Sequence, residues 1–178
     1  MSTHYWANSS TKSAPLNHDR YNCYMLSKLE TKIPPPVFGL ATAFLIWWLA
    51  KAAPFLTLIP SSISKLGIAL IIVGVLIDVS ALVQFIKQRT TPNPLSPQNA
   101  NAIVISGLYK FSRNPMYLGL LLSLTGWAIY QANLFGFVCL PIFIWLINTL
   151  QIMPEERILR EKFGDSYQLY LSKVRRWI

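Results

Sequence analysis

Four long apolar runs constrain what this chain can fold into. They cover residues 37–58, 66–86, 116–130 and 134–153. A helix needs ~20 residues to cross ~30 Å of hydrocarbon, so most of these runs are long enough for one crossing. The chain is 53% hydrophobic and only 13% charged, about half the charged fraction of an ordinary soluble domain. We therefore predict an all-α fold, an integral membrane four-helix bundle.

Only Gln131, Ala132 and Asn133 separate the third run from the fourth. A link this short forces two helices into an antiparallel hairpin. The start of the third run and the end of the fourth should then lie at the same end of the bundle.

Basic residues are distributed unevenly among the connections between runs. Fourteen of the 16 Lys and Arg residues lie before the first run, between the second and third, or after the fourth; the exceptions are Lys51 and Lys65. The positive-inside rule then predicts a multi-pass protein with both termini in the cytosol. The net charge of +9 would also attract anionic lipid head groups. Because the basic residues flank helices, we expect no nucleic-acid partner.

The chain divides into two parts by composition. Residues 1–33 are polar and lack the apolar core of a signal peptide, so we expect a flexible cytosolic tail. Residues 34–178 should form the membrane domain. Met25 opens the segment directly before the first apolar run and is an alternative translation start. We therefore expect residues 1–24 to be dispensable.

The histidines and cysteines give little material for a metal site or a nucleophile. His4 and His18 lie in the polar tail, and Cys23 and Cys139 are far apart. We predict no metal.

The most unusual segment, GLYKFSRNPMYLG at residues 107–119, stands directly before the third run. Pro115 suits the first turn of a helix, whose free N–H groups and dipole would favour an anion beside Arg113. Glu155 and Glu156 follow the fourth run, and the hairpin should bring them to the same depth. A cation beside two carboxylates at a lipid boundary suits a zwitterionic ligand.

An ordinary structural explanation exists for each of these charges. Acidic residues are common in the first turn of a helix, and an arginine at a membrane interface is a common anchor. Glu156 with Arg160, and Arg157 with Glu161, also have the spacing of ion pairs within one helix.

Asp78 interrupts the second run and shares a helix face with Gly67, Gly74 and Ala81. A carboxylate inside a membrane span suggests a functional role. The small residues equally suggest close helix packing with the acid turned inward. The sequence leaves both readings open.

Two further segments flank the charged cluster. The proline-rich stretch 90–99 cannot be helical throughout and should steer the chain from the second run into residues 107–119. Residues 154–178 read as an interfacial amphipathic helix that Gly164 breaks into two pieces. Its inward residues would be Ile158, Leu159, Phe163, Tyr167, Tyr170 and Val174.

Five motifs in order resemble the isoprenylcysteine carboxyl methyltransferase family, which is related to the phospholipid methyltransferases. They are TTPNP at 90–94, SGLY at 106–109, RNPMYLG at 113–119, the pair Glu155 and Glu156, and the C-terminal pattern FGxxYxxY at 163–170 with VRRW at 174–177. The resemblance covers residues 34–178. Asn114 stands where many members have histidine.

The resemblance implies a membrane methyltransferase that uses S-adenosyl-L-methionine at the cytosolic face. Arg113, Glu155 and Glu156 would be the catalytic residues. The implied cofactor-binding residues are Gly107, Tyr109, Arg113, Asn114, Pro115, Tyr117, Gly119, Glu155 and Glu156.

The implied acceptor is lipophilic, and an isoprenylcysteine-type carboxylate is favoured. Another isoprenoid or fatty acid, a lipid head group and a small thiol stay open. Methyl transfer to a carboxylate or thiolate needs alignment and exclusion of water more than a strong base. Two alternatives are an NADPH-dependent membrane reductase of related fold and a non-catalytic membrane scaffold. The sequence does not predict the oligomeric state.

Overall fold

The computed structural model describes residues 33–57, 60–87 and 103–178. Residues 1–32 of the predicted tail, with Met25, Cys23 and both histidines, lie outside the described residues, as does the proline-rich stretch 90–99.

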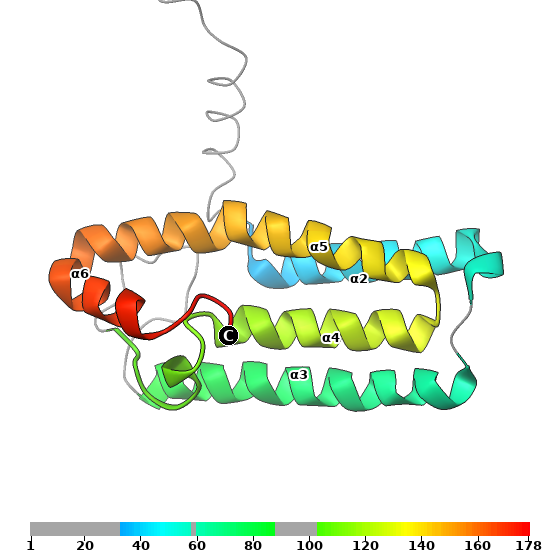
Figure 1. Cartoon of the computed structure of the whole chain (residues 1–178), viewed down its shortest axis with the longest axis horizontal. Coiled ribbons are helices and arrows are strands. Elements are labelled where there is room, and N and C mark those ends of the chain that lie inside the picture. The colour runs from blue at the N-terminus through cyan, green and yellow to red at the C-terminus, as the bar shows by residue number, and fades with distance from the viewer. Residues whose placement is uncertain (1–32, 58–59, 88–102) are drawn as a thin grey trace, which may run out of the picture.

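Four helices lie side by side along the long axis of the molecule (Figure 1). They are α2 (Pro35–Ala52), α3 (Ser61–Lys87), α4 (Pro115–Gln131) and α5 (Leu134–Ile147). The 3₁₀ turns η1 (Pro54–Leu56) and η3 (Gly107–Lys110) follow α2 and precede α4, respectively. The predicted all-α four-helix bundle is confirmed.

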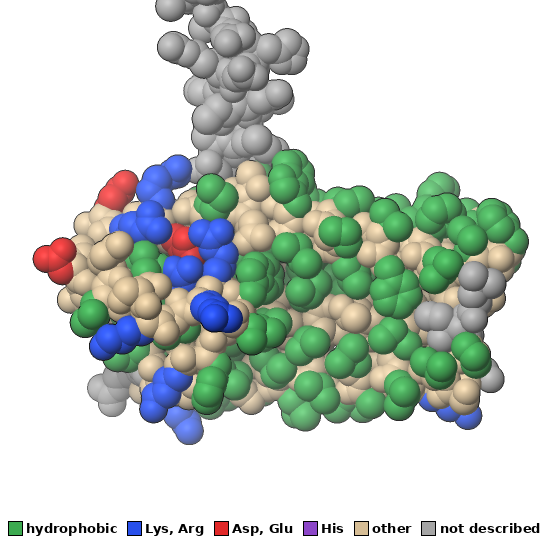
Figure 2. Space-filling model, viewed as in Figure 1, with side chains coloured by type: hydrophobic (Ala, Val, Ile, Leu, Met, Phe, Trp, Pro, Cys, Tyr) green, Lys and Arg blue, Asp and Glu red, His purple; other side chains and the backbone are tan. Residues whose placement is uncertain are grey.

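The outer surface of this bundle is apolar. Figure 2 shows hydrophobic side chains along its body, with Lys and Arg gathered toward one end. Large side chains such as Leu40, Phe44 and Trp145 are more than half exposed, as expected for a surface that faces lipid. Within the described residues, three helices are long and apolar enough to cross a membrane: α2, α3 and the continuous helix Leu134–Lys173. The fourth, α4, has 17 residues and lies between α3 and α5.

Glycines allow α3 and α4 to approach almost backbone to backbone. A Cβ on Gly67 would collide with the carbonyl oxygen of Gly126, and a Cβ on Gly119 would lie 2.6 Å from the carbonyl oxygen of Gly74. These pairs show that the two helices are antiparallel. The small-residue face predicted for the second run therefore packs against α4, as small residues do between membrane helices.

The link between α4 and α5 is a tight turn held by Asn133. Its side chain Oδ1 accepts a hydrogen bond from the N–H of Phe135 at 3.0 Å, which caps α5, and its Nδ2 donates to the carbonyl of Ala53 at 2.7 Å. Ala132 adopts a left-handed conformation, with φ of 57°. The predicted antiparallel hairpin is confirmed.

The helix does not stop where the fourth apolar run ends. A π-helical turn, η4 (Asn148–Ile152), joins α5 to α6 (Met153–Lys173) without a break. The wider turn lies directly before Pro154, whose ring would clash with the preceding turn of a regular α-helix. The sequence did not predict the π-helical turn.

Gly164 reverses the direction of α6. Its φ of 51° and ψ of −127° are non-helical, and glycine adopts such angles without steric cost. The second half of α6 therefore folds back, and the C-terminal residues return to the start of α4 (Figure 1). The predicted break at Gly164 is confirmed. Of the predicted inward residues, Tyr167, Tyr170 and Val174 form a buried cluster with Leu159 and Phe163 packed on it.

Candidate active site

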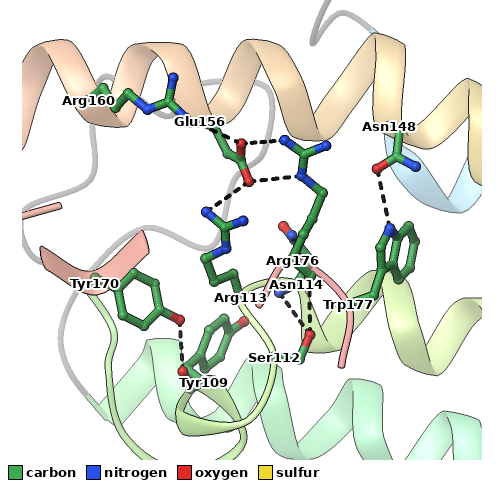
Figure 3. Close-up of polar contacts among 10 residues, drawn as sticks. All are labelled: Tyr109, Ser112, Arg113, Asn114, Asn148, Glu156, Arg160, Tyr170, Arg176 and Trp177. Carbon is green, nitrogen blue, oxygen red and sulfur yellow. Dashed lines mark hydrogen bonds and ion pairs between the residues drawn. The ribbon is translucent and has the colours of Figure 1, made fainter. Parts of the chain in front are cut away.

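Three segments that are distant in sequence meet at the polar end of the bundle (Figure 3). They are residues 107–114 before α4, the first turn of α6, and residues 174–178 after α6. Lys and Arg side chains gather toward this end of the molecule (Figure 2).

Glu156 is the centre of an ion cluster. Its side chain is 6% exposed, and its carboxylate lies 3.3 Å from the guanidinium of Arg113. Arg176 binds the same carboxylate with two parallel hydrogen bonds, Nε to Oε1 at 3.1 Å and Nη2 to Oε2 at 2.7 Å. Arg160 adds a weaker contact at 4.0 Å from a half-exposed side chain. Because Arg176 pairs in the fork geometry that suits carboxylates, it makes the strongest contact with Glu156.

Glu155, one residue earlier, has a different partner. The hydroxyl of Tyr117 donates a hydrogen bond to its Oε2 at 3.2 Å. Burial raises the pKa of the Glu155 carboxyl to about 7; the bond from Tyr117 acts in the opposite direction, and nearby Glu156 adds to the rise. Glu155 lies in the first turn of α6, just after the fourth apolar run ends at Met153. A carboxyl with a pKa near neutrality can gain negative charge when a cation binds beside it.

The turn η3 is fixed from two sides. Gln84 at the end of α3 accepts a hydrogen bond from the N–H of Leu108 at 3.1 Å, and a Cβ on Gly107 would collide with the Gln84 amide. On the other side, the hydroxyl of Tyr170 donates to the carbonyl of Tyr109 at 2.8 Å. Gly107 has φ of 59°, which favours glycine.

The C-terminal segment binds the loop that precedes α4 through its main chain. The carbonyl of Arg175 accepts from the N–H of Arg113 at 3.0 Å, and the carbonyl of Arg176 accepts from Asn114 Nδ2, also at 3.0 Å. Trp177 donates from its indole to Asn148 Oδ1 in the π-helical turn at 3.3 Å. These contacts hold Arg113 at the N-terminus of α4.

The structure brings together most of the predicted site residues. Arg113 meets Glu156 directly, as the hairpin predicted, and Tyr117 reaches Glu155. Asn114 faces the C-terminal segment, and Pro115 is buried in the first turn of α4. Gly107 and Tyr109 lie in η3, where the Tyr109 carbonyl accepts a hydrogen bond from Tyr170.

Gly119 is placed differently from the other predicted site residues. A Cβ there would collide with the Asp78 carboxylate, so Gly119 faces α3. Asp78 Oδ1 and Ser123 Oγ in the same interface are buried without a hydrogen-bond partner among the described residues. The packing role suggested for the small-residue face around Asp78 is therefore confirmed.

Four residues that support the site were not among the predicted site residues: Gln84, Tyr170, Arg176 and Trp177. Tyr170, Arg176 and Trp177 belong to the C-terminal motif of the family resemblance, but no spacing connects residue 176 with residue 156. The one available signal was Gly164, because a reversal there returns the chain toward its own helix.

The residues present fit a zwitterionic ligand with an anionic and a cationic group. Arg113 Nε is buried and has no hydrogen-bond partner in the described part of the chain, although the terminal nitrogen Nη1 contacts Glu156. Glu155 accepts from Tyr117 at one oxygen. A buried guanidinium nitrogen without a partner among the described residues and a carboxyl with raised pKa therefore lie at one end of the bundle. Residues 33–57, 60–87 and 103–178 contain no cluster of His, Cys, Asp and Glu that could hold a metal.

Known proteins that are similar to this chain include methyltransferases. The family described as phospholipid methyltransferase matches residues 63–166. A protein of Oryza sativa subsp. japonica named probable protein-S-isoprenylcysteine O-methyltransferase is 27% identical over 112 residues, which cover 63% of this chain and 59% of that protein. Protein-S-isoprenylcysteine O-methyltransferase A of Arabidopsis thaliana is 27% identical over the same length, 57% of its own chain.

A shorter relative has a higher sequence identity to this chain. An uncharacterized protein of Haemophilus influenzae is 48% identical over 63 residues, which are 35% of this chain and all of that protein. No solved structure gives a significant match. The chain thus spans less than two thirds of the length of the plant relatives. The family match covers more than half of this chain, including α4 and the glutamate pair, and the chain belongs to the phospholipid methyltransferase family.

Proposed function

We propose that this protein is a membrane methyltransferase that uses S-adenosyl-L-methionine and methylates a lipophilic carboxylate of the isoprenylcysteine type. The observation that carries the proposal is the meeting of Arg113 with the Glu155 and Glu156 pair at the polar end of a lipid-facing bundle. Family membership and the names of the plant relatives support the same chemistry. These relatives give no support to a reductase or a scaffold.

We assign binding of the cofactor to residues 107–119 together with the glutamate pair. Arg113 would hold its carboxylate, since guanidinium groups bind carboxylates strongly and the N-terminus of α4 adds a favourable dipole. The glutamates would hold its cationic amine or its ribose hydroxyls. Tyr109, Asn114, Pro115 and Tyr117 would shape the wall, and Gly107 would let η3 approach closely.

S-adenosyl-L-methionine supplies an activated methyl group on a sulfonium. This chain contributes orientation and exclusion of water, which suffice for an acceptor that is already a nucleophile. A carboxylate acceptor needs no proton removed, so the scarcity of histidine fits this reaction. An amine or hydroxyl acceptor would need a base in addition.

We infer that the acceptor reaches the site from the lipid phase. The outer faces of α3 and α5 carry large exposed apolar side chains up to the polar end, among them Ile86 and Trp145. An isoprenyl chain could therefore stay in hydrocarbon while its carboxylate enters the polar cluster. The membrane domain would be residues 34–178, with both termini on the cytosolic side.

The proposal is tested with purified protein in detergent. Methyl-labelled S-adenosyl-L-methionine is incubated with an isoprenylcysteine, a fatty acid, a phospholipid and a small thiol in separate reactions. We expect base-labile methyl ester to form on the isoprenylcysteine. Arg113→Ala should abolish cofactor binding, and unchanged affinity in that variant would refute the assignment.

A second measurement addresses the two alternative functions. Binding of S-adenosyl-L-methionine and of NADPH is compared on the same preparation. NADPH binding without S-adenosyl-L-methionine binding would favour a membrane reductase. Binding of neither would favour a scaffold.

A further inference from the structure

We propose that Arg176 is a positioning residue of this site and that its contacts give the two glutamates different roles. In this division Glu156 is a structural partner of Arg113 and Arg176, and Glu155 is the carboxyl that contacts the cationic part of the cofactor. The inference rests on the proposed function and adds a role that the motifs do not assign.

Glu156 has little capacity left for a ligand. Both of its carboxylate oxygens accept from Arg176, and Arg113 lies 3.3 Å from one of them. Its side chain is almost completely buried, and Figure 3 shows the arginines directed toward its carboxylate. A buried carboxylate with these partners is strongly held in place. A cationic ligand group would have to compete with two guanidinium groups for it.

The contacts of Arg176 also fix where Arg113 points. Its guanidinium shares Glu156 with Arg113, and its main-chain carbonyl binds Asn114 beside Arg113. Arg113 is therefore held through its side chain and through its neighbour. Loss of the Arg176 side chain would leave Arg113 as the closest cation beside Glu156 among the described residues. Arg113 could then move more easily.

Two groups of the cluster, Arg113 Nε and the Glu155 carboxyl, keep hydrogen-bonding capacity for a ligand. Arg113 Nε is buried without a partner in the described ranges, and Glu155 is held by the hydroxyl of Tyr117 alone among the contacts that the structure gives. Consecutive residues on a helix point about 100° apart, and Glu155 and Glu156 accordingly have different partners in this structure. The structure thereby assigns the ligand-facing role to Glu155.

The test compares single variants by two independent readouts. The first is the dissociation constant of S-adenosyl-L-methionine on detergent-solubilised protein. The second is amide hydrogen exchange in the peptide covering residues 108–116, measured without cofactor. We expect Arg176→Ala to weaken cofactor binding roughly 10- to 100-fold, as is typical for loss of a group that orients a binding residue, and to speed exchange in this peptide.

Conservative replacement separates positioning from simple loss of structure. Arg176→Lys should give an intermediate effect on both readouts, because an ammonium keeps the charge but not the paired hydrogen bonds. The KM for the cofactor should rise in both variants while the KM for the acceptor stays constant. Lys173→Ala removes a nearby exposed positive charge and should match the wild type. If Arg176→Ala does not fold, Arg176→Lys decides the question.

Two further variants test whether the glutamates have different roles. Glu156→Gln should speed exchange in residues 108–116 and weaken cofactor binding, whereas Glu155→Gln should weaken binding and leave this exchange unchanged. The inference is overturned if Arg176→Lys and Arg176→Ala behave as wild type, or if Glu155→Gln speeds exchange as much as Glu156→Gln. Absence of cofactor binding in the wild type would instead reject the proposed function, and the exchange experiment would still test the positioning role.

Discussion

The α3–α4 interface and the polar end of the bundle hold the same helix, α4, in opposite ways. In the interface the absence of side chains at Gly67, Gly74, Gly119 and Gly126 lets two backbones touch. At the polar end, long charged side chains from α6 and the C-terminal segment surround the first turn of α4. The first region depends on shape and the second on charge.

This difference separates the rigid frame from the part that can respond to a ligand. Close packing between glycines tolerates almost no displacement, because backbone atoms cannot move aside. Ion pairs at a polar surface respond to protonation and to added charge. We therefore expect substitutions in the two regions to differ in kind as well as in size.

The largest effect should follow from removing the charge of Glu156. Glu156→Gln leaves Arg113 and Arg176 facing each other without a carboxylate between them. Breaking a buried ion pair from one side costs about 3–5 kcal/mol. Thermal unfolding in detergent should show this loss, whereas Asp165→Asn, which neutralises an exposed acid, should leave the unfolding temperature unchanged. Equal unfolding temperatures for both variants would show that the charged cluster does not hold the polar end.

A methyl group in the glycine interface should have the next largest effect. In Gly67→Ala the new Cβ meets the carbonyl oxygen of Gly126 and lies 2.7 Å from the main-chain nitrogen of Tyr130. Overpacking costs about 1–3 kcal/mol, and backbone neighbours place this site at the upper end. The variant should unfold at lower temperature while the ligand-free exchange of residues 108–116 stays as in the wild type.

Gly39→Ala is the matched control for this substitution. Its Cβ would lie 2.7 Å from Cδ1 of Leu120, the end of a flexible side chain that can rotate away. We expect less than about 1 kcal/mol of destabilisation. If Gly39→Ala costs as much as Gly67→Ala, close backbone contact is not what distinguishes the α3–α4 interface.

Sequence reasoning predicted the frame better than the polar end, for a physical reason. The length of the apolar runs predicts the helices, the three-residue link predicts the hairpin, and Gly67 and Gly74 predict a packing face. All three predictions depend on local spacing. The hairpin even brings Arg113 to the glutamates. The rotation of α6 about its axis is not local, however, because the π-helical turn η4 shifts its phase. The sequence therefore could not predict which of Glu155 and Glu156 contacts Arg113.

Arg176 was unpredictable for a related reason. Its contact with Glu156 depends on the angles at Gly164, on the length of the second half of α6 and on the packing of Tyr167, Tyr170 and Val174. Gly164 predicts that the helix breaks, but it does not predict the direction in which the chain leaves. Small errors in that direction would move the chain end by several ångströms.

A smaller effect should appear as pH dependence through Glu155. Its pKa in the folded protein is about 7, above the ordinary 4.5, so the folded state binds more protons than the unfolded state between these values. Stability of the cofactor-free protein should therefore fall as pH rises through this interval. Binding of S-adenosyl-L-methionine should strengthen by roughly 10-fold between about pH 6 and about pH 8, as the carboxylate ionises.

Glu155→Gln is the control for both trends. The substitution removes the titrating group and keeps a side chain of the same size, so the differences from wild type isolate Glu155. Both pH trends should be weaker in Glu155→Gln than in the wild type. Parallel pH curves for the two proteins would assign the dependence to another group and weaken the ligand-facing role of Glu155.

The smallest expected effect compares one tryptophan from each region. Trp127 donates from its indole to the carbonyl of Ala43 within the bundle, and Trp177 donates to Asn148 at the polar end, at 3.0 and 3.3 Å. Replacing either by phenylalanine removes one hydrogen bond between packed segments, which is worth about 0.6 kcal/mol in a membrane protein. The two variants should therefore lose similar stability. Only Trp177→Phe should also speed amide exchange in residues 108–116, because Trp177 holds the segment whose carbonyls bind Arg113 and Asn114. Faster exchange in both variants would mean that the frame and the polar end respond as one unit, because a weakened contact in either region would then reach Arg113. Unchanged exchange in Trp177→Phe would show that its hydrogen bond does not hold the C-terminal segment.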